Sequence, residues 1–189
     1  MEESKPELRR TLHARLGAIS TGEREAATAR IARTVRRLPE LDGARTVLAY
    51  ASLPAEVGTD ELLEEAWRRG VRVVLPRCGP GDERMTLHRT EGVEQLSVGR
   101  YGIREPAREC EQISTGEVDL ALVPGVGWDR DRWRLGRGAG YYDRLLGSPD
   151  WRGLTVGLFY AAQEVERVPR DPWDVPLDLI VTEREVVRR

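Results

Sequence analysis

The chain has few of the residues that metal centres, disulfide frameworks and nucleophilic enzymes need. Its 189 residues include only two cysteines, Cys78 and Cys110, and two histidines, His13 and His88. Two cysteines make no disulfide framework here, and their spacing is not that of a zinc site. The sequence also has no Gly-x-Ser-x-Gly elbow and no suitable Cys–His pair, so a nucleophilic hydrolase is not indicated.

Long apolar runs and an excess of basic charge are also missing. No run approaches the length of a membrane span, and the charged N-terminal segment has no signal-peptide core. The formal net charge is −2, which argues against a general nucleic-acid binder but leaves room for a local basic pocket. We therefore expect a cytoplasmic protein that binds neither nucleic acid nor membranes, folded as a single domain over residues 1–189.

The apolar periodicity that is present predicts an α/β fold. Helical spacing covers residues 3–19, then a stretch from the capping box Ser20-Thr-Gly-Glu23 to about residue 38, and finally residues 59–69. Short apolar runs predict strands at 46–51, 71–76, 118–124, 154–159 and 177–181, with an edge strand at 85–89. The alternation of strand and helix predicts an open, mostly parallel, Rossmann-like sheet flanked by helices.

Residues 134–143 read Arg-Leu-Gly-Arg-Gly-Ala-Gly-Tyr-Tyr-Asp, and they concentrate the chemistry of the chain. Alternate glycines let the backbone approach a ligand and form an anion-binding nest. Arg134 and Arg137 suit phosphate oxygens, and Asp143 suits Mg²⁺. The stretch follows the predicted core strand 118–124, where α/β proteins place their active sites. The alternative is a plain glycine-rich turn between a strand and a helix.

The common phosphate-binding motifs do not match this stretch. It is neither a Walker A motif nor a dinucleotide fingerprint, and the protein-kinase set of motifs is missing. What remains is chemistry by positioning and charge neutralisation, as in phosphoryl transfer. Glu56 follows the predicted strand 46–51 at the same edge of the sheet. Lys5 and Arg9 lie on the first predicted helix, where spacing alone indicates a solvated basic face.

Taken together, Val-Pro-Gly-Val-Gly-Trp-Asp129 and the stretch 134–143 resemble the signature of the 5-formyltetrahydrofolate cyclo-ligase family, also called 5,10-methenyltetrahydrofolate synthetases. Lys5-Pro-Glu-Leu-Arg9, Tyr101–Pro106 and Asp178–Glu183 follow in family order. The resemblance implies a sheet like that of sugar-phosphate isomerases and CoA-transferases. It also implies ATP- and Mg²⁺-dependent closure of 5-formyltetrahydrofolate, with or without a polyglutamate tail, to 5,10-methenyltetrahydrofolate. ADP and phosphate are released, and we expect a monomer.

The resemblance also implies a set of site residues. The catalytic residues implied are Arg134, Arg137 and Tyr141. Those implied for ATP are Lys5, Arg9, Arg134, Gly136, Arg137, Gly138, Ala139, Gly140, Tyr141, Tyr142 and Asp143. Those implied for the folate are Ala51, Leu53, Glu56, Tyr101 and Tyr141, and those for the metal are Asp143 and Asp174.

Two departures from the family pattern and several alternatives stay open. Ala139 stands where many members carry Lys or Gly, and Arg132-Trp133-Arg134 replaces the usual Gly-x-Arg. The alternative to pterin stacking for Tyr101 is packing in the core, and the alternative to metal binding for Asp174 is a place in a surface turn. Two other functions also compete: a non-catalytic relative that binds nucleotide or folate, and a sugar-phosphate isomerase or CoA-transferase-like enzyme.

Overall fold

The computed structural model describes residues 3–78, 84–99 and 102–188, and its centre is an eight-stranded sheet in the order β12-β11-β10-β7-β1-β2-β3-β6. From β11 to β2 every neighbouring pair is parallel, and the remaining pairs are antiparallel. The strands are β1 (Thr46–Leu48), β2 (Arg72–Cys78), β3 (Met85–Thr90), β6 (Gln112–Ile113), β7 (Leu120–Val123), β10 (Leu154–Leu158), β11 (Leu179–Val181) and β12 (Val186–Val187). The predicted mostly parallel sheet is confirmed.

The strand predicted at 85–89 is confirmed as β3, but its predicted position at the edge of the sheet is wrong, because β6 pairs with the outer side of β3 through Leu87↔Ile113. Two short ladders outside the main sheet were not predicted. They are β4 (Leu96–Val98) with β5 (Arg104–Pro106), and β8 (Gly127–Trp128) with β9 (Arg134–Leu135). Strands of two or three residues are too short to show an alternating pattern in the sequence.

The helices are α1 (Lys5–Gly17), α2 (Thr21–Val35), α3 (Pro39–Asp42), α4 (Asp60–Arg68) and α5 (Tyr141–Leu146). The capping box of α2 is confirmed, since the Ser20 hydroxyl accepts from the Glu23 N–H at 3.3 Å. The helix ends at Val35, earlier than predicted, and Leu38 is extended with ψ 120°. A residue before proline disfavours the helical conformation, which explains that early end. No helix in the described ranges is both long and apolar enough to cross a bilayer.

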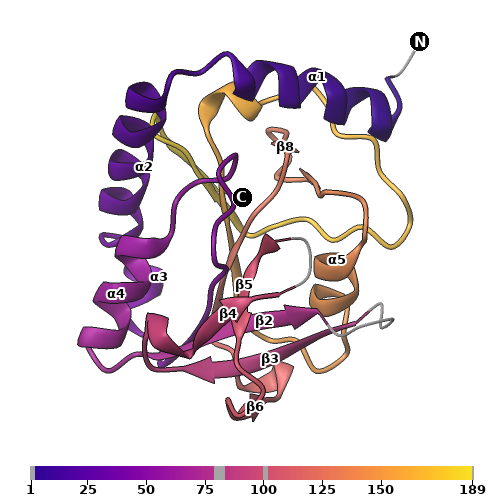
Figure 1. Cartoon of the computed structure of the whole chain (residues 1–189). Coiled ribbons are helices and arrows are strands. Elements are labelled where there is room, and N and C mark those ends of the chain that lie inside the picture. The colour runs from indigo at the N-terminus through magenta and orange to yellow at the C-terminus, as the bar shows by residue number, and fades with distance from the viewer. Residues whose placement is uncertain (1–2, 79–83, 100–101, 189) are drawn as a thin grey trace.

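The helices cover both faces of the sheet (Figure 1), with α2, α3 and α4 on one side and α5 on the other. Neighbouring strand residues point to opposite faces. Val73 packs in the core under α2 and α4, whereas Val74 packs with Leu145 and Leu146 of α5. Burial on both faces explains why these strands read as continuous apolar runs in the sequence.

The strand order reverses between β1 and β7, which are neighbours at the centre of the sheet. From β1 the chain continues through α4 to β2 on one side, whereas from β7 it continues to β10 and β11 on the other. The loops that follow β1 and β7 therefore diverge. In an open α/β sheet the crevice between such loops is the usual position of a ligand.

The hairpin between β8 and β9 contains the one non-glycine residue with positive φ in the described part of the chain, Arg132 at φ 67°. The Gly-x-Arg pattern of the family that the sequence resembles would place glycine here, and glycine adopts this conformation without strain. The Arg132 guanidinium donates to the Leu177 carbonyl at 3.1 Å. The sequence pointed to Trp133 as the altered flexible position, whereas the unusual backbone lies at Arg132, where a side-chain hydrogen bond partly offsets the strain.

Candidate functional site

A cavity of about 410 Å³ lies at the switch point, lined by Tyr50 and Ala51 after β1 and by Pro124 and Gly125 after β7. The stretch 134–143 forms another of its walls. Of the residues implied by the family resemblance, those that line it are Ala51, Glu56, Arg134, Gly136, Arg137, Ala139, Gly140, Tyr141, Tyr142 and Asp143. The fold thus brings most of the predicted nucleotide and folate residues to one cavity.

The glycine loop takes the conformation that its sequence favours. Gly138 has φ 113° and Gly140 has φ 66°, which are values that side chains rarely tolerate. Arg9 reaches across from α1 and donates through Nε to the Gly136 carbonyl at 2.8 Å. A Cβ on Gly138 would lie 3.5 Å from the Arg9 guanidinium carbon. The loop is therefore shaped by its glycines and held by an arginine from the first helix.

Arg134 is the most enclosed charged group of the loop. Its side chain is 2% exposed and forms an ion pair with Asp143 at 2.9 Å. It also donates to the Val175 carbonyl at 3.1 Å. Arg134 and Asp143 were predicted as separate phosphate and metal contacts, and the structure joins them. Because both partners are largely shielded from water, each depends on the other for charge compensation.

Arg137 differs from Arg134, because its side chain is 54% exposed and lies 3.8 Å from Glu56, which is 13% exposed. Burial raises the pKa of Glu56, although the hydrogen bond from the Leu53 N–H and the charge of Arg137 oppose that shift. The Leu53 N–H donates to Glu56 at 2.9 Å. Leu53 itself does not line the cavity, and its backbone N–H supports the Glu56 carboxylate instead.

Lys5, the only lysine in the chain, connects α1 to the segment after Pro169. Its Nζ lies 2.6 Å from both Asp171 and Asp174. Burial alone would lower the pKa of Lys5, but the bonds to the two aspartates outweigh that effect and the pKa is raised. Asp174 is therefore no isolated surface residue. Asp171 was missed in the sequence, where nothing distinguished it from other charged turn residues.

Asp143 and Asp174 are the two predicted carboxylates that could hold Mg²⁺, and each is paired with a cation in this structure, Asp143 with Arg134 and Asp174 with Lys5. The Val175 N–H donates to Asp143 Oδ1 at 3.4 Å, so the residue after Asp174 already contacts the other carboxylate. Among the described residues no three potential ligands cluster. Mg²⁺ needs only one or two carboxylates when phosphates and water supply the rest. The donor set suits a phosphate-bound Mg²⁺ better than an all-protein cage.

The other side of the cavity was not predicted from the sequence. It is lined by Cys78 of β2, Met85 of β3, and Ile103 and Glu105 near β5. The register pairs Cys78 with Met85, a relationship that only strand pairing creates.

Tyr101, the predicted pterin-stacking residue, lies outside the described residues. The Tyr142 hydroxyl is buried without a hydrogen-bond partner in the described part of the structure, and the Arg144 guanidinium lies 5.4 Å over the Tyr141 ring.

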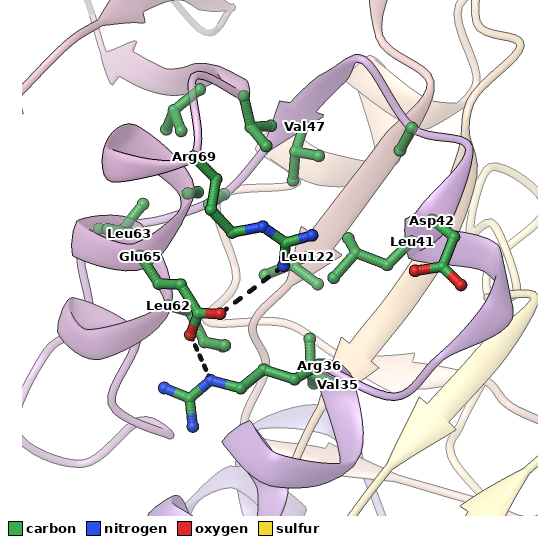
Figure 2. Close-up of a pocket in the computed structure, with 15 residues that line it drawn as sticks. Val35, Arg36, Leu41, Asp42, Val47, Leu62, Leu63, Glu65, Arg69 and Leu122 are labelled. Atoms are coloured by element: carbon green, nitrogen blue, oxygen red, sulfur yellow. Dashed lines mark hydrogen bonds and ion pairs between the residues drawn. The ribbon is translucent and has the colours of Figure 1, made fainter.

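A second hollow of about 70 Å³ lies on the α2 and α4 side of the sheet. Figure 2 shows Glu65 between the guanidinium groups of Arg36 and Arg69, at 2.5 and 3.6 Å. The rest of its lining is mostly apolar, with Val73 and Leu122 among the residues that face it. Glu65 pairs with both arginines, and none of the predicted site residues lines this hollow. It is a packing gap in the core.

Comparison with known proteins shows the family to which the chain belongs. The model of the 5-formyltetrahydrofolate cyclo-ligase family matches residues 1–183. A probable 5-formyltetrahydrofolate cyclo-ligase of Schizosaccharomyces pombe is 32% identical, over 100% of this chain and 99% of that protein. The 5-formyltetrahydrofolate cyclo-ligase of Escherichia coli K12 is also 32% identical, over 78% of this chain and 83% of its own length.

Solved structures give the same result. The 5,10-methenyltetrahydrofolate synthetase of Aquifex aeolicus superimposes with a TM-score of 0.85 at 38% identity, covering 97% of this chain and 92% of that one. The Mycoplasma pneumoniae 5,10-methenyltetrahydrofolate synthetase gives 0.76 at 27% identity, covering 95% and 99%. A whole-chain family match and a shared fold, together with a cavity at the sheet's switch point, lead to one conclusion: the chain is an enzyme of the 5-formyltetrahydrofolate cyclo-ligase family.

Proposed function

We propose that this enzyme closes 5-formyltetrahydrofolate to 5,10-methenyltetrahydrofolate at the expense of ATP, releasing ADP and phosphate. The observation that carries the proposal is the approach of Arg137 to Glu56, at 3.8 Å. Arg137 belongs to the anion-binding glycine loop, and Glu56 belongs to the loop after β1. A reaction between a phosphate donor and a folate requires that the residues binding the two substrates lie close together.

The reaction divides into two steps. In the first, the formyl oxygen on N5 attacks the γ-phosphorus of ATP, the bond to the bridging oxygen breaks, and ADP leaves. In the second, the N10 lone pair attacks the activated formyl carbon, the carbon–oxygen bond breaks with release of phosphate, and the N10 proton is lost. Phosphorylation turns a poor leaving group into a good one, and the ring closes as the methenyl cation.

The residues of the cavity have distinct parts in these steps. Glu56 binds the folate, and Arg137 together with the backbone N–H groups of the loop neutralises charge on the transferring phosphoryl group. Arg134 contributes positive charge while it is paired with Asp143. Lys5 and Arg9 bind phosphates from α1. The bound Mg²⁺ would be held by Asp143 and Asp174 and would neutralise charge on the β- and γ-phosphates. No general base is assigned to the N10 proton.

The reaction is tested by absorbance of methenyl-folate after mixing the protein with 5-formyltetrahydrofolate, Mg²⁺ and ATP. We expect ATP-dependent product, and a fall in kcat/KM of about 100-fold for Arg137→Ala. Arg68→Ala is the matched control, because Arg68 is an exposed arginine on α4 that does not line the cavity. No ATP-dependent signal from folded protein would overturn the proposed reaction. Near-normal activity of Arg137→Ala would overturn the role of Arg137 alone.

We also propose that the enzyme acts as a cytoplasmic, single-domain monomer. Size-exclusion chromatography with light scattering at several concentrations tests the monomer directly. A concentration-independent mass near 21.3 kDa is expected. A stable dimer would overturn this part of the proposal and leave the reaction untouched.

A further inference from the structure

Trp173 is the tryptophan that the fold leaves in solvent. Its exposed fraction is 68%. Among the described residues, the other tryptophans are buried or partly buried within the hydrophobic clusters. Single exposed apolar residues are ordinary on protein surfaces, so exposure alone has no functional meaning. The contacts around Trp173 are what indicate a function for it.

Trp173 stands at the tip of a rigid turn, Asp171-Pro172-Trp173-Asp174. The Asp174 N–H donates to the Asp171 carbonyl at 3.0 Å, which closes the turn. The Asp171 N–H in turn donates to the Asp174 carboxylate at 2.8 Å. Pro172 fixes its own φ. The aromatic ring therefore extends from a pre-organised support and not from a loose loop.

The base of that turn is bound to the groups that we assign to the nucleotide phosphates. Lys5 Nζ contacts both of its aspartates at 2.6 Å, and the segment passes beside α1 (Figure 1). Immediately after the turn, Val175 donates to Asp143 and accepts from Arg134. Trp173 is therefore two residues from backbone atoms that contact the phosphate loop.

The turn 171–174 lies on the phosphate side of the proposed site. In the proposed function folate binds at Glu56, the phosphates bind on the glycine loop, and Lys5 contacts the phosphates from α1. Lys5 also contacts the turn 171–174, so we place the nucleotide base at the rim where α1 and this turn meet. Trp173 does not line the enclosed part of the cavity, which agrees with a place at the rim.

We propose that the Trp173 indole is the stacking surface for the purine base of the nucleotide, a subsite that rests on the proposed function above. Stacking of a base on an aromatic ring is strong in protein complexes and tolerates any purine, because every base has a π-face. The phosphate groups give affinity through charge, and the indole adds a contribution that only a nucleotide with a base receives.

The experiment compares two probes, Mg–ATP and inorganic tripolyphosphate, which carries the phosphates without a base. Calorimetric titration of Trp173→Ala should show ATP affinity about tenfold weaker than wild type, with tripolyphosphate affinity unchanged. Trp173→Phe keeps an aromatic face and should retain most of the ATP affinity. ATP should also alter the tryptophan fluorescence of the wild type, and Trp173→Phe should lose that change although its other tryptophans remain.

Two results would overturn the subsite while leaving the proposed reaction intact. One is ATP affinity of Trp173→Ala equal to that of wild type. The other is an equal loss of ATP and tripolyphosphate affinity, which would mean that the residue acts by holding the turn that binds Lys5. If wild-type protein binds neither probe, the nucleotide of the proposed function is overturned together with the subsite.

Discussion

The guanidinium of Arg134 lies 2.9 Å from the carboxylate of Asp143, and its side chain is only 2% exposed. This pair joins the glycine loop to the start of α5. It also changes how variants of the site should be interpreted. A substitution at Asp143 removes a proposed metal ligand and, at the same time, leaves a buried positive charge without its partner.

We predict that Asp143→Asn and Arg134→Met each lower the free energy of unfolding by about 3 kcal/mol, because each leaves one buried charge uncompensated. The double variant should be more stable than either single variant. Denaturant unfolding followed by circular dichroism measures all three. Arg137→Ala is the control, since its exposed side chain should change stability little. Full stability of Asp143→Asn would contradict the dependence of Arg134 on this carboxylate.

Arg132 gives a second prediction, based on backbone strain. Its φ of 67° is costly for any side chain, and its hydrogen bond to the Leu177 carbonyl offsets part of that cost. Arg132→Gly removes both the strain and the bond, so its stability should stay within about 1 kcal/mol of wild type. Arg132→Ala keeps the strain and loses the bond, so it should be the less stable variant by thermal unfolding. The reverse order would show that the positive φ is not strained.

Glu56 gives a prediction about pH. Burial raises its pKa above the ordinary 4.5, so the folded protein holds this proton more tightly than the unfolded chain does. Stability from the protonated form is complete below the ordinary pKa and is lost as the pH rises through the raised value. Glu56→Gln cannot ionise. Its free energy of unfolding should therefore increase relative to that of wild type as the pH rises from the ordinary pKa of Glu56 through the raised one.

The matched control for that experiment is Glu64→Gln, because Glu64 is exposed on α4. The difference between this variant and wild type should not change across the same pH range. A constant difference for Glu56→Gln as well would show that burial does not disfavour the Glu56 carboxylate.

Tyr142 and Tyr50 form a matched pair for the cost of a buried hydroxyl. The Tyr142 hydroxyl has no partner among the described residues, whereas the Tyr50 hydroxyl donates to the Val57 carbonyl at 2.9 Å. Tyr142→Phe should leave stability unchanged or raise it by about 1 kcal/mol, and Tyr50→Phe should lower it by about 1–3 kcal/mol. Urea unfolding of both variants tests the contrast. Equal losses would show that the Tyr142 hydroxyl is already satisfied.

The hollow in Figure 2 predicts opposite effects for two neighbouring residues of β2. Val73 faces this hollow, whereas Val74 faces the closed core beside α5. Val73→Ile adds one methylene to open space and should stabilise the protein by about 0.8 kcal/mol. Val74→Ile overfills a packed site and should destabilise it by about 1–3 kcal/mol. A stabilising Val74→Ile would show that the core beside α5 is also loosely packed.

The sequence by itself determined the elements whose signals are local. Apolar spacing was enough for α1, α2, α4 and the central strands, because one or both of their faces are buried along their whole length. The conformation of the glycine loop was also predictable, since Gly138 and Gly140 adopt angles that their residue type favours. The family was predictable from the same loop, because few sequences need that order of glycines and arginines.

Only the tertiary structure decided which charges meet. Lys5 and Asp174 are separated by most of the chain, and Glu56 and Arg137 by less than half of it, yet both pairs meet in the folded protein. Nothing in the sequence indicated that Asp171 also forms an ion pair with Lys5, or that Arg134 is buried against Asp143. The physical reason is that strand order brings distant loops together. Periodicity reports which face of an element is buried, and it carries no information about which element lies opposite.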